Sequence, residues 1–371
     1  MKVNTDCRFY LAYKPCKFHK IDRRHCDNCS DYDPIKKLIL IIKLDALGDV
    51  LRTTSILPAL KKRYPQSEIT WITRKNAFSI LKGNEYIDRL FAVEENFLQY
   101  IQGELFNIGL CLDADTESAS ILTIAKCNIK KGFFTNENGK VIPVDNNSQE
   151  WHEMGINDDL KKNNRKTYQQ IIYEICGLNN DIELPQFILD DTSVEFGNQF
   201  FKQNKLKQFD KILGINTGGG KRWQFKKWIQ KYYSDLIVLI KQQYPNHGII
   251  LMGGPEEVEF NDKILKEVGG LVIDAGCNNS IKEFGALISF LDLCFTPDSL
   301  GMHISIALQK TTIVNVGPTS PWELSVYGNG EIIYNEALDC IACYKSLCDL
   351  KVNCMNTLEP KIIMEKMNKY L

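Results

Sequence analysis

Short apolar runs alternate with longer amphipathic stretches along most of the chain. Residues Leu38–Ile42 form the clearest run, apolar at every position, as expected of a parallel strand covered on both faces. The amphipathic stretch 50–65 follows it, and Pro58 within it predicts a kink or a late helix start. Because runs and amphipathic stretches keep alternating, the pattern predicts an α/β fold with parallel sheets. Further strands are expected at residues 69–72, 90–92 and 108–112.

A second alternating series begins at Lys211, after a linker-like stretch at 179–189. Two series of this kind predict two Rossmann-like domains facing a cleft, with ligands at the carboxyl ends of the strands. Residues 136–165 are rich in Asn, Asp and Lys, and we expect a loop region there. The expected divisions are a cysteine-rich segment at 1–35, a first domain at 36–190, a second domain at 205–335, and a cysteine-rich segment with a closing helix at 336–371.

The composition agrees with a two-domain globular protein. The chain has 371 residues, 44% of them hydrophobic and 25% charged, and its formal net charge is -1. A near-neutral charge without aromatic–basic interleaving argues against nucleic acid as a partner. No apolar run is long enough to span a bilayer, and the N-terminus lacks the apolar core of a signal peptide. We therefore predict a cytoplasmic protein that can rest on the inner face of the membrane.

Eight of the 13 cysteines fall into two clusters. Clustered cysteines without a secretion signal favour metal binding over disulfides. The first cluster has the spacing C-x8-C-x9-C-x2-C, and the second has the tighter spacing C-x2-C-x4-C-x5-C, which suits a tetrahedral metal. The predicted metal ligands are Cys7, Cys16, Cys26 and Cys29 in the first cluster, and Cys340, Cys343, Cys348 and Cys354 in the second.

The identity of the metal stays open at this point. Structural zinc is the default for four thiolates, with mononuclear iron or an iron–sulfur cluster as the alternative. His19 and His25 are additional candidate ligands in the first cluster. The interpretation without metal is reduced cysteines in surface loops, or disulfides formed on oxidation.

The segment Asn216–Trp223 lies between a predicted strand and a predicted helix. Its glycines, Gly218–Gly220, allow backbone N–H groups to cradle phosphate oxygens, and Lys221 and Arg222 add positive charge. The alternative is a flexible turn followed by a solvated basic pair. The spacing is not that of a Walker A loop, so the pattern favours a phosphate site of another kind.

Two further strand ends in the second domain carry candidate ligand-binding residues. Glu257, at the end of the turn Gly253–Glu257, can accept ribose hydroxyls or simply complement a helix dipole. Asp298, in the segment Thr296–His303, is placed to cap a helix whose N-terminus would face a diphosphate. Taken alone, a plain cap at Asp298 and a core histidine at His303 are the better interpretation.

Carboxylates also follow strands of the first domain. Asp45 and Asp49 flank the loop after the first strand, where a general base would face the cleft, although Asp49 can also cap the following helix. Asp113 and Asp115 resemble a metal-binding D-x-D motif. We assign them to capping or acceptor contact instead, because they end a strand of the domain opposite the phosphate-binding loop.

These motifs occur together in an order that resembles the heptosyltransferases of glycosyltransferase family 9. The similarity covers residues 37–371, and it departs from the family pattern at Gln224, in place of proline, and at Leu300-Gly301, in place of Gly-Pro. The residues that carry it are Gly48-Asp49-Val50, Lys221-Arg222-Trp223 with Trp228, Gly253-Gly254-Pro255-Glu256-Glu257, Asp298-Ser299 with Met302-His303, and Gly317-Pro318-Thr319.

The resemblance implies a GT-B fold and an inverting transfer of heptose from ADP-heptose without a catalytic metal. The first domain would then bind the acceptor and the second the nucleotide sugar. Asp49 matches the family's catalytic carboxylate, Glu257 a carboxylate on the nucleotide side, and Asp298 a residue at the donor helix terminus. The donor-binding residues implied by the match are Asn216, Thr217, Gly218, Lys221, Arg222, Glu257, Asp298, Ser299, Met302 and His303.

The acceptor stays open between lipopolysaccharide core, another glycan, a lipid-linked sugar and a protein. The alternatives to heptosyl transfer are another sugar nucleotide, or a nucleotide-binding assembly or regulatory protein without turnover. One family branch uses a cysteine site for iron and assembles into large rings, so an oligomer is among the expectations. The C-terminal segment of GT-B proteins often crosses back to the first domain, which would place the two cysteine clusters side by side.

Overall fold

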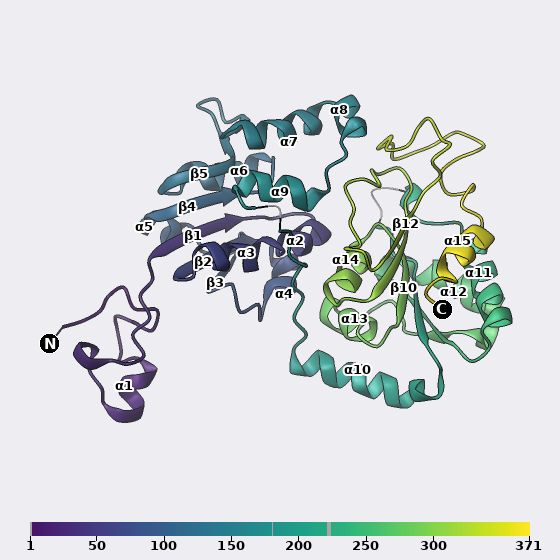
Figure 1. Ribbon diagram of the computed structural model, residues 1–371, viewed down its shortest axis with the longest axis horizontal. Helices are drawn as coiled ribbons and strands as arrows, with labels where there is room; N and C mark the ends of the chain where they lie inside the picture. Colours follow the sequence, from purple (N-terminus) through teal and green to yellow (C-terminus); the bar gives the residue numbers. More distant parts are fainter. Residues whose placement is uncertain (1, 180, 221–223) are drawn as a thin grey trace.

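Two six-stranded sheets flanked by helices form the two halves of the protein (Figure 1). The structure, a computed structural model, describes residues 2–179, 181–220 and 224–371. In the first sheet the strand order is β3-β2-β1-β4-β5-β6, and only the pairing of β5 with β6 is antiparallel. Its strands are β1 (Lys37–Ile42), β2 (Ser67–Thr73), β3 (Arg89–Ala92), β4 (Phe106–Cys111), β5 (Cys127–Thr135) and β6 (Val141–Pro143).

The second sheet is parallel throughout, in the order β12-β11-β10-β7-β8-β9. Both sheets are doubly wound: strands are added first to one side of the starting strand and then to the other. This order reverses between β1 and β4 in the first sheet and between β7 and β10 in the second. Such switch points are where open α/β sheets bind ligands. The strands are β7 (Ile212–Asn216), β8 (Gly248–Met252), β9 (Ile273–Asp274), β10 (Leu293–Pro297), β11 (Thr311–Asn315) and β12 (Gly330–Ile333).

Helices follow most of the strands, as the alternating pattern predicts. The helical stretch after β1 breaks at Thr54, and a new helix, α3, begins at Ile56. Pro58 therefore lies in the first turn of α3, which confirms the predicted late start. No helix in the described ranges is long and apolar enough to cross a membrane. The helices of the first half are α2 (Leu47–Thr53), α3 (Ile56–Arg63), α4 (Phe78–Leu81), α5 (Leu98–Gly103), α6 (Thr116–Ile124), α7 (Asn146–Ile156), α8 (Asp158–Asn163) and α9 (Tyr168–Cys176). Those of the second half are α10 (Asp191–Gln203), α11 (Gln230–Gln243), α12 (Val258–Val268), α13 (Ile281–Ile288), α14 (Leu300–Ala307) and α15 (Pro360–Met367).

The continuous apolar run of β1 is explained by burial on both faces. Ile39 and Ile41 enter one hydrophobic cluster and Leu40 and Ile42 another, and all four side chains are fully buried. At roughly 2 kcal/mol for each buried aliphatic side chain, a central strand of this kind is a major source of stability. Its C-terminal end is therefore a rigid base for the loop that begins at Lys43.

The two domains share one hydrophobic cluster. Residues of the first sheet and of α9 belong to the same cluster as Ile304 of α14 and Leu287 of α13. Where α2 packs against α14, a Cβ added to Gly48 would lie 2.7 Å from Cδ2 of His303. Only glycine allows the two helices to pack this closely at that position, and this contact aligns the two switch points.

Two sequence expectations are wrong. Residues 136–165 are not a loop region, because β6, α7 and α8 lie there. The C-terminal segment does not cross back to the first domain. It packs on the second domain, where Trp228 Nε1 donates a hydrogen bond to the carbonyl of Leu358 at 2.9 Å and α15 contributes Ile363 to the core beside α11. The two cysteine clusters therefore lie at opposite ends of the molecule and not side by side (Figure 1).

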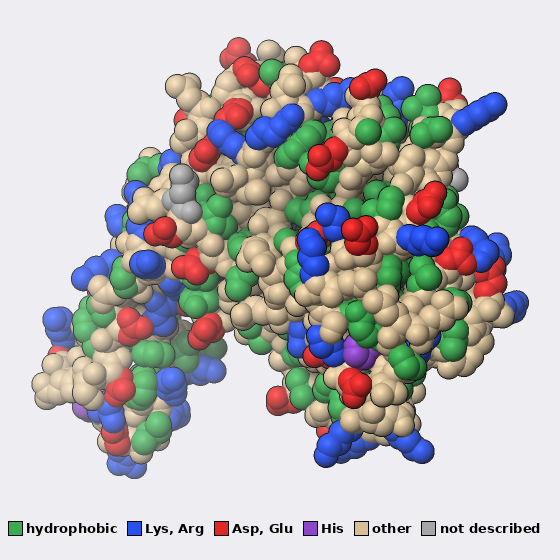
Figure 2. Space-filling view, turned by 45° about the vertical axis from the view of Figure 1, so that its right-hand side comes forward, with side chains coloured by type: hydrophobic (Ala, Val, Ile, Leu, Met, Phe, Trp, Pro, Cys, Tyr) green, Lys and Arg blue, Asp and Glu red, His purple; other side chains and the backbone are tan. Residues whose placement is uncertain are grey.

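The N-terminal cysteine segment (residues 2–36) stands off the first domain as a separate lobe (Figure 2). It contains α1 (Lys17–Asp22) and a single β-bridge between Cys7 and Pro34, and none of its side chains is buried. Arg8 attaches it by an ion pair with Asp88 and by a hydrogen bond from Nη2 to the carbonyl of Ser67 at 2.9 Å. A segment without a core has little hydrophobic stabilisation of its own.

A buried ion pair fixes the ends of β1 and β4. Lys43, which is 3% exposed, pairs with Asp113, and the other Asp113 oxygen accepts a hydrogen bond from the backbone N–H of Leu44 at 2.6 Å. Asp115 accepts hydrogen bonds from Glu117 and Ser118 as the N-cap of α6. Asp115 thus caps a helix, as one of the two expected roles has it, whereas Asp113 belongs to a buried ion pair that the sequence did not predict.

We predict that Asp113→Ala destabilises the protein by about 3–5 kcal/mol, because it leaves the Lys43 charge buried without its partner. The matched variant Asp115→Ala loses only a helix cap and should cost about 1 kcal/mol. Urea unfolding of both variants measures the two free energies. Equal losses would contradict the special role of the buried pair.

Candidate active site

A cleft of about 910 Å³ lies between the domains, at the carboxyl ends of β1, β7 and β10. Both switch points open into it, and both domains line it. From the first domain come Asp49, Arg52, Trp151, Met154 and Lys161; from the second come Asn216, the loop Gly218–Gly220, Glu257, Asp298, Ser299, His303 and Glu323. The prediction of a cleft at the carboxyl ends of the strands is confirmed.

Asp49 faces the cleft from the third position of α2. Its Oδ1 pairs with Arg52 one turn along the helix, at 2.7 Å from Nη2. Burial alone would raise the pKa of Asp49, but the charges of Arg52 and Lys43 outweigh burial and lower that pKa. Asp49 is therefore ionised at neutral pH and able to accept a proton.

Arg52 is held on its other face by an aromatic ring. Its guanidinium lies 3.5 Å from the ring centre of Tyr168, whose hydroxyl is 2.7 Å from Oγ1 of Thr53. Burial opposes the charged guanidinium, but the neighbouring Asp49 and further acidic groups raise the pKa of Arg52 overall. The carboxylate and the aromatic face together fix the position of this charge.

The glycine-rich loop of the second domain, which is predicted to bind phosphate, begins at Asn216. Its amide Nδ2 donates hydrogen bonds to Oγ1 of Thr296 at 2.9 Å and to Oγ of Ser299 at 3.2 Å, and its Oδ1 accepts one from the N–H of Gly218 at 3.1 Å. This single side chain ties the ends of β7 and β10 together. Lys221 and Arg222, which the sequence adds to the same site, lie outside the described residues.

The next strand end places Glu257 under the loop. Its Oε2 accepts a hydrogen bond from the N–H of Gly254 at 3.0 Å, and its Oε1 pairs with Nζ of Lys227 at 2.6 Å. Thr217 is fully buried and donates a hydrogen bond to Oδ1 of Asn261 at 2.6 Å. Glu257 thus lines the cleft, whereas Thr217 supports it from behind.

Asp298 does not cap α14, contrary to the sequence expectation. Ser299 is the N-cap residue, and Asp298 instead pairs with Nζ of Lys226 at 2.7 Å and accepts a hydrogen bond from Thr319 at 2.8 Å. Burial alone would raise the pKa of Asp298, but Lys226 and the other nearby cations lower it to about 2. This carboxylate stays charged and faces the cleft.

His303 lies between the charged groups of both domains. Burial and the charge of Arg52 lower the pKa of His303 to about 4, and Asp298 and Asp49 offset only part of this effect. The imidazole is therefore neutral at pH 7. Met302, one position earlier, is buried in a hydrophobic cluster with Val314 and does not line the cleft. His303 is thus buried, as expected of a core histidine, but it also lines the cleft.

Several cleft residues had no signal in the sequence. Lys226 belongs to an ordinary-looking basic pair, and Glu323 and Tyr344 lie outside every strand-end motif. Only the partners, which come from distant parts of the chain, distinguish them from solvated surface charges.

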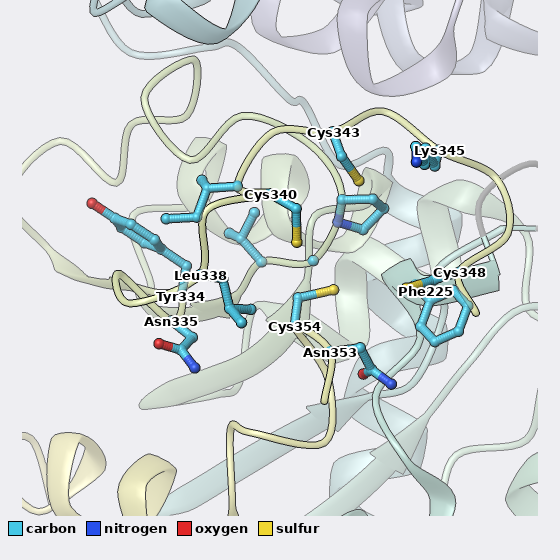
Figure 3. Close-up of a pocket in the computed structure, with 14 residues that line it drawn as sticks. Phe225, Tyr334, Asn335, Leu338, Cys340, Cys343, Lys345, Cys348, Asn353 and Cys354 are labelled. Atoms are coloured by element: carbon cyan, nitrogen blue, oxygen red, sulfur yellow. The ribbon is translucent and has the colours of Figure 1, made fainter. Parts of the chain in front are cut away.

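The second cysteine cluster lines a small pocket beside the cleft. Figure 3 shows Cys340, Cys343 and Cys354 with their sulfur atoms directed into this pocket, and Cys348 beside Phe225. Burial, together with the nearby charges of the other three cysteines, raises the pKa of Cys354 to about 12. Across the described ranges no three His, Cys, Asp or Glu side chains are arranged closely enough to hold a metal ion.

Comparisons with known proteins identify the family of this chain. The model of the family described as glycosyltransferase family 9 (heptosyltransferase) matches residues 95–353. The chain belongs to glycosyltransferase family 9. A Campylobacter jejuni protein named lipooligosaccharide heptosyltransferase 2 is 29% identical to this family 9 chain over 218 residues, which are 56% of this chain and 66% of the relative. The match thus spans slightly less than two thirds of the relative's length.

Solved structures extend the similarity to most of this family 9 chain. A glycosyl transferase family 9 structure from Veillonella parvula superposes with a TM-score of 0.73 at 16% identity, over 90% of this chain and 97% of that one. The dodecameric iron-containing heptosyltransferase TibC, in complex with ADP-D-beta-D-heptose, superposes with a TM-score of 0.54 at 10% identity, over 91% and 76% of the two chains. These similarities confirm the predicted GT-B fold.

The burial of His303 predicts a pH dependence of stability. Its pKa is about 6.5 in the unfolded chain and about 4 when folded, so the unfolded state takes up the proton first as the pH falls. The stabilising contribution is fully present above pH 6.5 and is lost towards pH 4, by about 2 kcal/mol between pH 7 and pH 5. Asp298, with its pKa near 2, titrates below this window.

We expect His303→Gln to lose less stability than the wild type between pH 7 and pH 5, as measured by urea unfolding at both values. His152→Gln, on α7 and outside the cleft, is the control and should keep the wild-type dependence. A His303 variant with an unchanged pH dependence would show that this histidine is not buried in its neutral form.

Proposed function

We propose that the protein is an inverting glycosyltransferase that moves heptose from ADP-heptose to an acceptor hydroxyl, with Asp49 as the general base. One observation carries this proposal: an ionised carboxylate of one domain and a glycine-rich loop at a strand end of the other face the same cleft. The C. jejuni relative is a named heptosyltransferase and TibC was solved with ADP-D-beta-D-heptose, which supports the sugar and the nucleotide.

The reaction follows from these positions. The acceptor hydroxyl attacks the anomeric carbon, its proton passes to Asp49, and the bond from that carbon to the diphosphate oxygen breaks. Negative charge then grows on ADP. Backbone N–H groups of Gly219 and Gly220 and the ammonium group of Lys226 lie at the cleft and would stabilise it. No step in this scheme requires a metal at the diphosphate.

The ion pair with Arg52 makes Asp49 a weaker base, because it lowers the pKa of the carboxylate. The same pair keeps the carboxylate charged and fixes its direction. General bases of this kind contribute about 10²–10⁴-fold to a rate, with orientation as an essential part of the effect. Glu257, next to the loop, would accept the ribose hydroxyls, and Ser299 and His303 would border the sugar.

The acceptor that we propose is a sugar of the lipooligosaccharide or lipopolysaccharide core, because the C. jejuni relative is named a lipooligosaccharide heptosyltransferase. Trp151 and Met154 of α7 line the acceptor side of the cleft. A flat aromatic ring and a flexible thioether there suit the apolar face of a sugar.

We predict that Asp49→Ala lowers the rate of heptosyl transfer by about 10²–10⁴-fold and leaves ADP binding within about twofold of the wild type. The reason is that Asp49 belongs to the domain opposite the diphosphate loop. Transfer is followed by mass spectrometry of the product and binding by titration calorimetry with ADP and, for comparison, UDP and GDP. Loss of ADP binding in a folded Asp49→Ala protein would contradict this division of roles, and a wild-type preference for UDP or GDP would contradict the donor.

We further propose that each cysteine cluster binds one structural zinc or iron ion. In the second cluster, four thiols border one pocket, and thiolates suit either metal. Because no three of the described side chains lie close enough to hold an ion as they stand, binding would have to draw the thiols together. A cation there would favour the thiolate of Cys354, whose pKa is raised mainly by burial and in part by the neighbouring cysteines. In the first cluster, a segment without buried side chains needs a cross-link of some kind, and the rings of His19 and His25 lie 5.5 Å apart beside its cysteines.

Metal analysis of the purified protein should find roughly one ion per cluster. The paired substitution Cys343→Ser with Cys348→Ser should remove one ion, and Cys26→Ser with Cys29→Ser should remove the other. Cys277→Ser, a buried cysteine outside both clusters, is the control. Metal-free wild-type protein prepared under reducing conditions, or loss of no ion in either pair, would contradict the assignment.

A further inference from the structure

The C-terminal cysteine loop (residues 340–354) reaches into the cleft through one aromatic residue. Tyr344 follows Cys343 directly, and its backbone N–H donates a hydrogen bond to the carbonyl of Pro318 at 2.8 Å. Its hydroxyl accepts a hydrogen bond from the N–H of Ser320 at 3.2 Å and donates one to Oε1 of Glu323 at 3.0 Å. The loop therefore forms part of the wall of the cleft.

The first domain contacts the same ring. The ammonium group of Lys161, in α8, lies 4.2 Å from the ring centre of Tyr344. Both side chains line the cleft. Tyr344 is thus held from three directions, by the segment Pro318–Ser320, by the carboxylate of Glu323 and by a cation of the opposite domain.

Glu323 is fixed at both of its ends. Its backbone carbonyl accepts a hydrogen bond from the N–H of Tyr168 at 3.0 Å, and its Oε1 accepts the hydrogen bond from Tyr344. Within the described part of the chain, no hydrogen bond or ion pair engages its Oε2. The side chain lines the cleft, so this oxygen is available to a ligand there.

The position of Glu323 points to the sugar of the donor. It belongs to the second domain, and the charges of Asp298 and Arg52 both act on its carboxylate. Asp298 begins the segment before α14, and Arg52 pairs with the base Asp49. The sugar that passes from donor to acceptor must lie between these groups.

We propose that Glu323 is a specificity-determining residue whose Oε2 accepts hydrogen bonds from hydroxyl groups of the donor sugar, and that Tyr344 is the positioning residue that orients this carboxylate. The inference rests on the proposed function. Charged acceptors bind sugar hydroxyls more strongly than neutral ones, and an oriented carboxylate loses little freedom on binding. The cysteine loop then contributes to sugar recognition without touching the sugar.

The test compares two ligands that differ only in the sugar. Calorimetric titration of the full-length protein with ADP and with ADP-heptose gives both dissociation constants. Glu323→Gln should weaken binding of ADP-heptose on the order of ten- to hundredfold and leave binding of ADP within about twofold. Tyr344→Phe should act in the same direction by roughly three- to tenfold, because the carboxylate remains but loses its orientation.

Tyr232→Phe is the matched control, since its hydroxyl donates to the carbonyl of Asn356 at 3.2 Å, just after the loop and outside the cleft. It should change neither constant, and melting temperatures establish that all three variants fold. Equal weakening of ADP and ADP-heptose in Glu323→Gln would indicate a general structural effect and overturn the proposal, as would no change for either ligand. A Tyr344→Phe variant identical to the wild type would overturn the positioning role. Failure of the wild type to bind ADP at all would instead overturn the proposed function.

Discussion

The guanidinium of Arg52 is the charge on which the arrangement of the cleft depends. It is fixed by the 2.7 Å ion pair with Asp49 and by the ring of Tyr168, and its charge acts on Asp298, Glu323 and the imidazole of His303 in the opposite domain. Without this cation, the carboxylates of the two domains would face each other with little between them. Like charges in a partly buried site repel strongly, so Arg52 allows the domains to close around a set of acidic groups.

Pairing of carboxylates with cations also occurs in the second domain. Glu257 is matched by Lys227 and Asp298 by Lys226, and both lysines come a few residues after the glycine-rich loop. A diphosphate carries several negative charges and would be repelled by the carboxylates alone. Lys226 lines the cleft, so its ammonium group can turn from Asp298 to an anionic ligand. The electrostatics of this side of the cleft thus favour an anion.

The sequence was informative where a residue's role depends on near neighbours. Leu38–Ile42 is a strand because its side chains are buried on both faces, and Asn216, Glu257 and Asp298 follow strands, so the edge of the sheet brings them together. The helix α7 was missed because it buries only Ser148 and Met154, which leaves a weak amphipathic pattern in a polar stretch. The cap of α14 was misplaced by one residue, since Asp298 and Ser299 are both good caps and only the distant Lys226 decides between them.

Long-range packing explains the remaining differences. No pattern near Arg52 predicts that its guanidinium will contact the ring of Tyr168. Likewise, no pattern in the C-terminal segment predicts that Trp228 and α11 hold this segment to the second domain. Spacing can indicate which cysteines belong together, but it does not tell what else their loop contacts.

The backbone of the C-terminal cysteine loop argues that the loop and the cleft form one structural unit. Ala342 and Tyr344, on either side of Cys343, have φ angles of 56° and 51°, in the left-handed region that non-glycine residues avoid at a cost of roughly 1–2 kcal/mol each. Contacts must offset this cost. Ala342 is fully buried, and Tyr344 has its hydrogen bonds to the segment before Glu323. The shape of the loop around Cys343 is therefore specified from the side of the cleft as well as from the side of the cysteine pocket.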